Sequence, residues 1–287
     1  MYALIRPVDG ILLIDKERGP TSHDVVARVR SESGEWNVGH AGTLDPLATG
    51  LLVLCLGRAL KVVEFMEGHD KEYEVAVRLG RTTETDDAEG RVVTERDAGA
   101  VTRESLVAAA AKFTGEIRQR PPAYSAVRVG GRRLYQYARA GEPVEAPERA
   151  VVIREFALLS FEPPLARFRV RCSKGTYIRS LARDLGESLA CGGSVEALRR
   201  TASGPFRVEQ AVSDFAREAV MPVDAGLAHL PEVRLSPEDA SRFLKGQRCE
   251  AAPAGPLARV YGEGRFLGVG HGVDGRLWPR KVLAGVQ

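Results

Sequence analysis

The sequence is poor in the residues that build metal sites and disulfide frameworks. Its 287 residues include only 4 cysteines, which are widely separated and form no C-x-x-C pair. The 5 histidines are equally dispersed, and none lies four residues from another. Zinc sites and disulfide-stabilised domains normally show close spacings of these residues. We therefore expect no protein-bound metal and no disulfide among Cys55, Cys172, Cys191 and Cys249.

Long apolar runs are also missing. No purely apolar run exceeds that of Leu51–Leu56, which is far shorter than the roughly 20 residues of a membrane-spanning helix. The N-terminal stretch MYALIRPVDGILLIDK contains the acid Asp9 and no small-residue cleavage site, so we expect no signal peptide and a cytoplasmic protein. A hydrophobic content of 44% and a charged content of 28% are typical of a globular protein.

Positive charge is present in small excess but is unevenly distributed. The net charge is +3, yet the stretch from Ile117 to Gly141 has six arginines, three tyrosines and no acid. Arginines neutralise phosphates and tyrosines stack on bases, so this segment is a candidate for binding nucleic acid. The alternative is a solvated basic face. The arginines are Arg118, Arg120, Arg128, Arg132, Arg133 and Arg139.

Helical and strand periodicities alternate along the first two thirds of the chain. Thr21 or Ser22 is expected to cap a helix that ends near Gly34, and Thr102 to cap a second helix that Gly115 closes. The stretches YEVAVRLG and FRVRCSKG alternate apolar and polar residues, which predicts two strands.

A third helix is expected to begin near Thr176. Its apolar stripe is formed by Ile178, Leu181, Leu185 and Leu189. Arg179 follows Ile178, so it is expected to leave the buried stripe at the positive end of the helix. Because strands and helices intermix without strict β–α–β alternation, we expect an α+β fold with a large mixed or antiparallel sheet flanked by helices.

The last part of the chain has a different character. The stretch MPVDAGLAHLPEV, residues 221–233, is expected to be a linker, and Ser236 with Pro237 is expected to start a short helix. Short strands separated by turn signals follow in LARVY, RFLGVG and GRLWPRKVL. We therefore expect a large domain over residues 1–230 and a small β-rich domain over residues 231–287.

One carboxylate stands alone in the stretch GHAGTLDPLATG. Asp45 lies between Leu44 and Pro46, with no second acid in the ten residues that follow. It could be a turn aspartate that accepts backbone hydrogen bonds. It could be a phosphoryl acceptor or metal ligand, although such sites normally need companion acids. It could also be a nucleophile or charge stabiliser at an electron-poor sugar carbon.

The third role requires a carboxylate that stays ionised away from bulk water. Burial alone raises the pKa of a carboxyl group, whereas an arginine partner favours the ionised form. Arg179 is the candidate partner, because it falls off the apolar stripe near a helix start.

At this point the sequence resembles a known family. The stretch GHAGTLDPLATGLLVLCLGRALKV resembles the central motif of the TruB family of pseudouridine synthases. The similarity continues in ILLIDKERGPTSHDVV, EYEVAVRLGRTTETDDAEGRV, PPAYSAVRVGGRRLYQYARAGEPV and CSKGTYIRSLARDLGESLACGGSVEALRRTASGPF. It runs in order from about Gly10 to Phe206, with a weaker match to a PUA-like module at the C-terminus.

The resemblance implies an isomerase that converts a uridine in folded RNA to pseudouridine without cofactor or metal. Bacterial members act on the T-loop uridine of tRNA, conventionally position 55. The expected partner is therefore the T-arm of tRNA, and the enzyme is expected to work alone as a monomer. The rival within the class is a guide-RNA-dependent synthase of the dyskerin type. The rival from another class is a tRNA-folding or RNA-binding module whose catalysis is secondary.

The resemblance also assigns site residues. Asp45 takes the place of the catalytic aspartate, and Arg179 that of the arginine paired with it. His40 resembles the histidine at the space of the extruded nucleotide, with a hydrogen-bonded loop histidine as the alternative. Tyr73 resembles the tyrosine that stacks on the target base, although its strand pattern also fits a core aromatic.

Further assignments concern the pocket walls and the RNA grip. Tyr177 and Leu198 resemble walls of the uracil pocket, and plain core packing is the alternative for Leu198. Lys16 resembles a motif lysine near the site, for which a structural role is the alternative. The basic insertion, about residues 118–150, resembles a mobile segment that grips the stem-loop. Two departures, Glu17 in place of a common proline and Glu72 in place of a common basic residue, weaken the peripheral RNA contacts.

Overall fold

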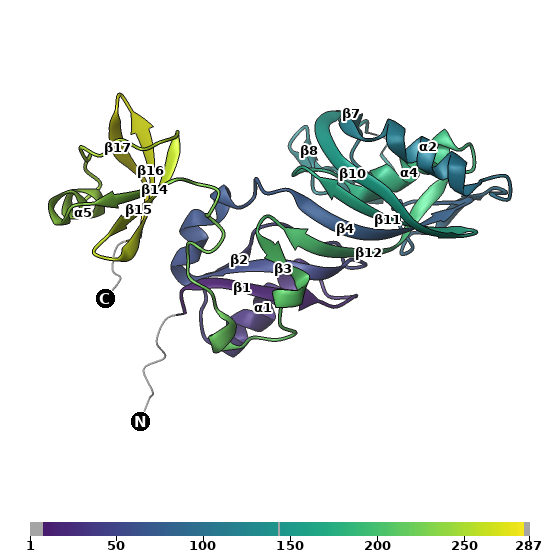
Figure 1. Cartoon of the computed structure of the whole chain (residues 1–287). Helices are drawn as coiled ribbons and strands as arrows, with labels where there is room; N and C mark the ends of the chain where they lie inside the picture. Colours follow the sequence, from purple (N-terminus) through teal and green to yellow (C-terminus); the bar gives the residue numbers. More distant parts are fainter. Residues whose placement is uncertain (1–7, 143, 284–287) are drawn as a thin grey trace.

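The computed structural model describes residues 8–142 and 144–283. Residues 1–7, on which the expectation of no signal peptide partly depends, lie outside this range, as do residue 143 of the predicted insertion and the last four residues. Figure 1 shows a large sheet that carries most of the chain and a small sheet at the C-terminal end. The expected α+β fold with a large mixed sheet is confirmed.

The large sheet has nine strands, and every pairing in it is antiparallel except that of β12 with β3. Its main path runs in the order β1 (Gly10–Lys16), β3 (Thr49–Leu56), β12 (Gly193–Ser203), β4 (Lys71–Leu79), β11 (Leu165–Cys172), β10 (Arg149–Glu162) and β7 (Gly115–Gln119). Two short strands are added at its sides, β2 (Val38–His40) on β3 and β13 (Phe206–Arg207) on β12. The central strands β4 and β12 therefore join the two halves of the sheet (Figure 1).

The helices begin where the sequence supplies caps. The Thr21 side chain accepts from the N–H of Asp24 at the start of α1 (Ser22–Ser33), and Gly34 ends that helix in the left-handed conformation. Thr102 caps α2 (Arg103–Lys112) in the same way. The expected closure of α2 by Gly115 is wrong, because the helix ends at Lys112 with Phe113 as its C-cap residue, and Gly115 opens β7.

Two further helices follow in the second half of the large sheet's sequence and in the basic segment. The third predicted helix is α4 (Ile178–Ser188), which starts two residues later than expected, with Tyr177 as its N-cap residue. A short helix that the sequence pattern did not predict, α3 (Leu134–Ala140), follows the small hairpin of β8 (Arg128–Val129) and β9 (Arg132–Arg133) inside the basic segment. Another small hairpin, β5 (Arg81–Thr83) with β6 (Val92–Glu95), follows β4.

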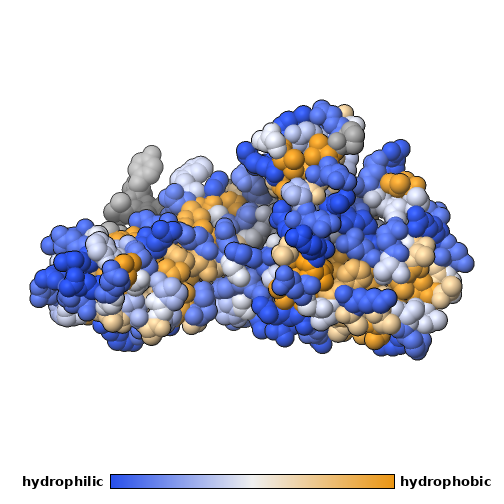
Figure 2. Space-filling model, turned by 90° about the horizontal axis from the view of Figure 1, so that it is seen from above, coloured by the Kyte–Doolittle hydropathy of each residue, from blue (hydrophilic) through white to orange (hydrophobic). Residues whose placement is uncertain are grey.

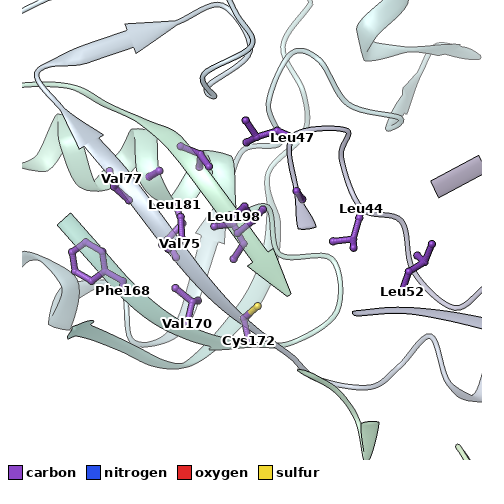
Figure 3. Packing of buried hydrophobic residues seen from close by; sticks show 14 of the residues in the cluster. Leu44, Leu47, Leu52, Val75, Val77, Phe168, Val170, Cys172, Leu181 and Leu198 are labelled. Atoms are coloured by element: carbon purple, nitrogen blue, oxygen red, sulfur yellow. The ribbon is translucent and has the colours of Figure 1, made fainter. Parts of the chain in front are cut away.

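The hydrophobic core lies on the sheet and extends to the stretch that carries Asp45. Figure 3 shows Leu44 and Leu52 in the same cluster as Val75, Val170 and Leu198. Leu44 is 4% exposed, so the residue directly before Asp45 is packed into the core. The surface in Figure 2 is mainly hydrophilic, with smaller hydrophobic patches between protruding polar side chains. None of the helices in the described part of the chain has the length and apolar character needed to cross a membrane.

The small sheet has the order β14 (Glu232–Leu235), β15 (Leu257–Gly262), β16 (Arg265–Val273) and β17 (Arg276–Val282). The hydroxyl of Ser236 accepts from the N–H of Asp239 and caps α5 (Pro237–Leu244), as expected. The division into domains of residues 1–230 and 231–287, and the likeness of the second to a PUA module, stay predictions. The structure adds that the second sheet begins at Glu232.

The stretch expected to be a linker is in fact packed against the large sheet. Met221 exchanges backbone hydrogen bonds with Ile11 at 3.0 and 2.8 Å, and Leu227 is fully buried. His229 lies with its Nδ1 3.3 Å from Nε2 of His69, beside β4. The sequence pattern did not predict this packing, because proline, glycine and alanine are also common in linkers that contact no other part of the protein.

The histidine contact should make stability pH-dependent. Burial lowers the pKa of His69 to about 4, and the charges of His229 and Lys71 add to this while Asp70 opposes it. Between the ordinary pKa of 6.5 and this lowered pKa, the unfolded chain takes up a proton that the folded chain refuses. We expect the free energy of unfolding to fall as the pH is lowered through this window, measured by urea titration at about pH 7 and 5.

The His69→Gln variant should show a smaller loss of stability over the same pH interval. The exposed His23 on α1 offers a control, and His23→Gln should keep the pH dependence of the wild type. If the free energy of unfolding of His69→Gln falls with pH as steeply as that of the wild type, groups other than His69 cause the acid sensitivity.

Candidate active site

The stretch around Asp45 is held by hydrogen bonds on both sides of the carboxylate. The hydroxyl of Ser22 donates to the carbonyl of Leu44 at 3.0 Å and accepts from the N–H of Leu44 at 2.8 Å. After Asp45, the carbonyl of Pro46 accepts from the N–H of Gly19 at 2.9 Å. The start of α1 thus fixes the backbone that presents Asp45.

Lys16 belongs to this support and not to the cavity described below. Its side chain is 1% exposed, and Nζ donates to the carbonyls of Glu17 and Pro20 at 2.8 and 2.7 Å and to that of Pro46 at 3.3 Å. Burial lowers the pKa of Lys16, while the charges of Glu89 and Asp45 oppose this effect. The geometry favours the structural alternative for Lys16, which ties β1 to the residue after Asp45.

Arg200 is a second support, and sequence reasoning missed it. It is 2% exposed and donates to the carbonyls of Leu51, Gly42 and Thr43 at 2.7, 3.1 and 3.3 Å. The guanidinium therefore fixes the turn between β2 and β3 from the side of β12. The sequence contained one indication of this role. Arg199 and Arg200 are consecutive in a strand, so their side chains point to opposite faces of the sheet and one of the two arginines must face inward.

Asp45 and Arg179 meet, although the two residues are far apart in the chain. Nε of Arg179 lies 2.9 Å from Oδ2 of Asp45. The Asp45 side chain is 38% exposed and that of Arg179 only 8%. Arg179 is off the apolar stripe as expected, but it is buried because three other segments cover it.

The remaining N–H groups of Arg179 also have partners. Nη1 donates to the carbonyl of Thr85 at 3.0 Å and Nη2 to that of Tyr124 at 3.1 Å. Nη1 also lies 3.6 Å from Oδ2 of Asp87, whose side chain is 6% exposed. The guanidinium is therefore fixed between two carboxylates and two carbonyls, which limits its rotation.

Asp87 was not identified as a site residue from the sequence. Its Oδ1 accepts from the hydroxyl of Thr85 and from the N–H of Glu89, so its own position is determined. The adjacent Asp86 has a positive φ of 61° and contacts Arg183 at 3.0 Å. The signal available was the run ETDDAEG directly after a strand, where four acids and a glycine indicate a turn.

Asp45 lies on the wall of a cavity of about 430 Å³. Tyr73, Tyr177, Arg179 and Leu198 line the same cavity, so the structure brings together five of the seven predicted catalytic and substrate-binding residues. His40 lies in an adjoining cleft of about 610 Å³ that shares Tyr73 and Tyr177 with the first. These volumes lie in the range of small-ligand sites, and the apolar and aromatic walls can bind a planar ring.

The electrostatics of the two spaces differ. Burial lowers the pKa of His40, and the charge of Arg200 lowers it further, so this imidazole is neutral near pH 7. Burial raises the pKa of the Tyr73 phenol, against the opposing charge of Arg200. Burial likewise lowers the pKa of Lys71, in the cleft with His40, to about 8. The Asp45 cavity thus adjoins a cleft lined by four basic side chains and one acid, Glu67, and this excess of positive charge suits a ligand with phosphates. The basic residues are Lys71, Arg149, Lys174 and Arg200.

The basic segment contributes one wall of the Asp45 cavity. Tyr124, Ser125, Tyr135 and Arg139 line it. Arg139 stacks over Tyr135, with 5.4 Å between its guanidinium carbon and the ring centroid. Arg139 is the only one of the six predicted RNA-binding arginines among the lining residues of this cavity.

The other arginines of the segment have different surroundings. Arg120 contacts Glu145 at 3.3 Å, and Arg132 contacts Glu142 at 2.9 Å. Acids just after Gly141 therefore neutralise part of the positive charge of the segment. The prediction missed this because it considered only the stretch that ends at Gly141. The remaining three, Arg118, Arg128 and Arg133, are exposed.

Family models match nearly the whole described chain in three consecutive parts. Residues 30–178 match "TruB family pseudouridylate synthase (N terminal domain)". Residues 179–228 match "tRNA pseudouridylate synthase B C-terminal domain". Residues 231–283 match "Pseudouridine synthase II TruB, C-terminal".

Similar proteins and structures agree with these matches. A protein named tRNA pseudouridine synthase B from Pseudomonas aeruginosa is 45% identical, over 97% of each chain. A protein of the same name from Aromatoleum aromaticum is 47% identical, over 98% of this chain and 94% of its own. Among solved structures, a Cbf5-Nop10-Gar1 complex contains a chain with 26% identity and a TM-score of 0.71, covering 93% of this chain and 79% of the other. An H/ACA RNP chain at 23% identity and a TM-score of 0.74, covering 96% of this chain and 85% of the other, shows the same fold.

The hydrogen bonds of Arg200 lead to a test of how the Asp45 turn is held. Arg200→Met should lower the free energy of unfolding by about 3 kcal/mol, because three buried carbonyls lose a charged donor. The neighbouring Arg199, paired with Asp15 in a half-exposed contact, is the matched control. Arg199→Met should cost less than about 1 kcal/mol in the same denaturant titration. Equal costs for the two variants would contradict the supporting role of Arg200.

Proposed function

The chain belongs to the TruB family of pseudouridylate synthases, and from this premise we propose that it isomerises a uridine of tRNA to pseudouridine. The finer proposal is that the target is the T-loop uridine at position 55. The observation that carries the proposal is the contact of Asp45 with the buried Arg179 at 2.9 Å, on the wall of a cavity large enough for a nucleoside.

The reaction needs a negative group beside the sugar and no external reagent. The bond between C1′ of the ribose and N1 of the uracil breaks, the uracil turns, and C5 bonds to C1′. The proton lost from C5 is replaced by one gained at N1, so the product is an isomer of the substrate. Asp45, paired with the guanidinium of Arg179, either attacks C1′ or assists elimination at the sugar, and both routes require its carboxylate in contact with the ribose.

The target base must leave the stacked loop to reach this carboxylate. Extrusion of a base costs a few kcal/mol, which contacts inside the pocket offset. We assign Tyr73 to stacking on the uracil and Tyr177 and Leu198 to the walls around it, because all three line the cavity with Asp45. His40, neutral and in the adjoining cleft, is assigned to the space that the nucleotide leaves.

We further propose that the protein acts on tRNA alone, as a monomer and without guide RNA or cofactor. The relatives at 45–47% identity that cover nearly the whole chain are named tRNA pseudouridine synthase B, which supports a direct tRNA substrate. The chain of the Cbf5-Nop10-Gar1 complex is more distant, at 26% identity. The module of β14–β17 is assigned to RNA binding as a PUA-like domain.

A bare tRNA transcript tests this proposal. The purified protein alone should form pseudouridine at position 55, located by chemical mapping of the transcript. Asp45→Asn should abolish turnover while binding persists, because the substitution removes the charge and keeps the shape. Pseudouridine formation by Asp45→Asn would contradict the assigned role of the carboxylate. Activity only in the presence of added guide RNA and proteins would favour the guide-dependent alternative.

The exposed arginines of the basic segment provide a second test. Arg128 and Arg133 make no ion pair with another described residue, whereas Arg132 is held by Glu142. Replacing Arg128 and Arg133 with Ala should weaken tRNA binding and flatten the plot of log Kd against log salt by about one unit for each lost phosphate contact. The exposed Lys112 at the end of α2 is the control, and Lys112→Ala should keep the wild-type slope. If the double variant keeps the wild-type salt dependence of Kd, these two arginines do not contact the tRNA.

A further inference from the structure

One side chain of the Asp45 cavity carries a hydrogen-bonding group that the protein itself leaves unused. Ser125 is 6% exposed, and its hydroxyl has no hydrogen-bond partner within the described residues. The residue lines the cavity together with Asp45, Tyr73 and Leu198. A buried hydroxyl without a partner is unfavourable, so a native structure that keeps one usually reserves it for a ligand or water.

The backbone holds Ser125 close to the proposed catalytic pair. The carbonyl of the preceding residue, Tyr124, accepts from Nη2 of Arg179, whose Nε contacts Asp45. The carbonyl of Ser125 itself accepts from the N–H of Tyr135 at 3.2 Å. Two consecutive carbonyls are thus fixed, one to α4 and one to α3, so the position of the serine is determined before any ligand enters.

Three other buried serines do not show this pattern. The hydroxyl of Ser22 bonds to both backbone groups of Leu44, that of Ser180 donates to the carbonyl of Arg120 at 2.8 Å, and that of Ser33 donates to the carbonyl of Val29 at 2.6 Å. Those serines hold the fold together. Ser125 makes no such side-chain contact, which separates its hydroxyl from the structural ones.

We propose that the hydroxyl of Ser125 hydrogen-bonds the extruded uridine in the cavity and acts as a specificity-determining residue. This inference rests on the proposed function. The hydroxyl can donate to a uracil carbonyl oxygen or pair with the ribose 2′-hydroxyl, and both groups belong to the one nucleotide that reaches Asp45. The contact requires the basic segment to lie against the cavity, so it joins the RNA-gripping part of the chain to the reacting nucleotide.

The test compares activity with stability in two serine variants. Ser125→Ala should lower kcat/KM on the tRNA transcript by about 10-fold, since one hydrogen bond to substrate is lost. Its Tm should stay the same or rise, because no bond within the protein is removed. Ser33→Ala, which loses bonds to the Val29 carbonyl and the Glu35 N–H, should show the reverse: a lower Tm and an unchanged kcat/KM. A merely structural serine at position 125 would lower Tm and activity together, and that result would overturn the inference.

Transcripts with a single altered target nucleotide identify the atom that the serine contacts. The target is replaced by 2-thiouridine, 4-thiouridine or 2′-deoxyuridine in separate transcripts. The analogue that removes the contacted group should slow the wild type but cause no further loss in Ser125→Ala. Equal additional losses in both proteins for all three analogues would overturn the inference, as would wild-type kcat/KM in Ser125→Ala. Pseudouridine formation by the wild type in the same assay shows that such a failure concerns Ser125 and leaves the proposed function standing.

Discussion

The guanidinium of Arg179 is the group on which the arrangement of the site depends. It contacts Asp45 and Asp87 and donates to the carbonyls of Thr85 and Tyr124. A buried cation is costly unless it is paired and hydrogen-bonded, and here every side of the guanidinium has an acceptor. Its Nε is thereby directed at Asp45, the more exposed of its two carboxylate partners. The position of the Asp45 carboxylate at the cavity wall follows from this geometry.

The fold brings these partners together from four separate parts of the chain. Asp45 lies between β2 and β3, Thr85 and Asp87 between β5 and β6, Tyr124 in the basic segment, and Arg179 in the first turn of α4. The central strands β4 and β12 connect these parts, and their pairing places Tyr73 opposite Arg200. Arg200 then fixes the turn that carries Asp45 by donating to the backbone carbonyls of Gly42, Thr43 and Leu51. A rigid sheet thus supplies the precision that loops alone would not give.

Local sequence patterns predicted the helices and strands of this fold, but they did not predict contacts between residues far apart in the chain. Caps such as Thr21 and Ser236 and the alternation in YEVAVRLG act through neighbouring residues, so the sequence alone reveals them. The proximity of Asp45 to Arg179 was expected through the family resemblance and the position of Arg179 off the apolar stripe. Asp87 and Arg200 were missed because their partners lie more than ninety residues away, and no spacing rule reports such a contact. The packing of residues 221–233 was missed for the same reason.

The hydrogen bond between Arg179 and the Tyr124 carbonyl has a consequence for the order of events on the enzyme. The basic segment that carries Tyr124 also carries the arginines assigned to RNA. If this segment swings outward to admit a stem-loop, the guanidinium loses one of its four acceptors and gains freedom to turn. Closure over the bound loop restores that acceptor and, with it, the alignment of the carboxylate. Such a movement would link substrate capture to the alignment of Asp45 through a single peptide group.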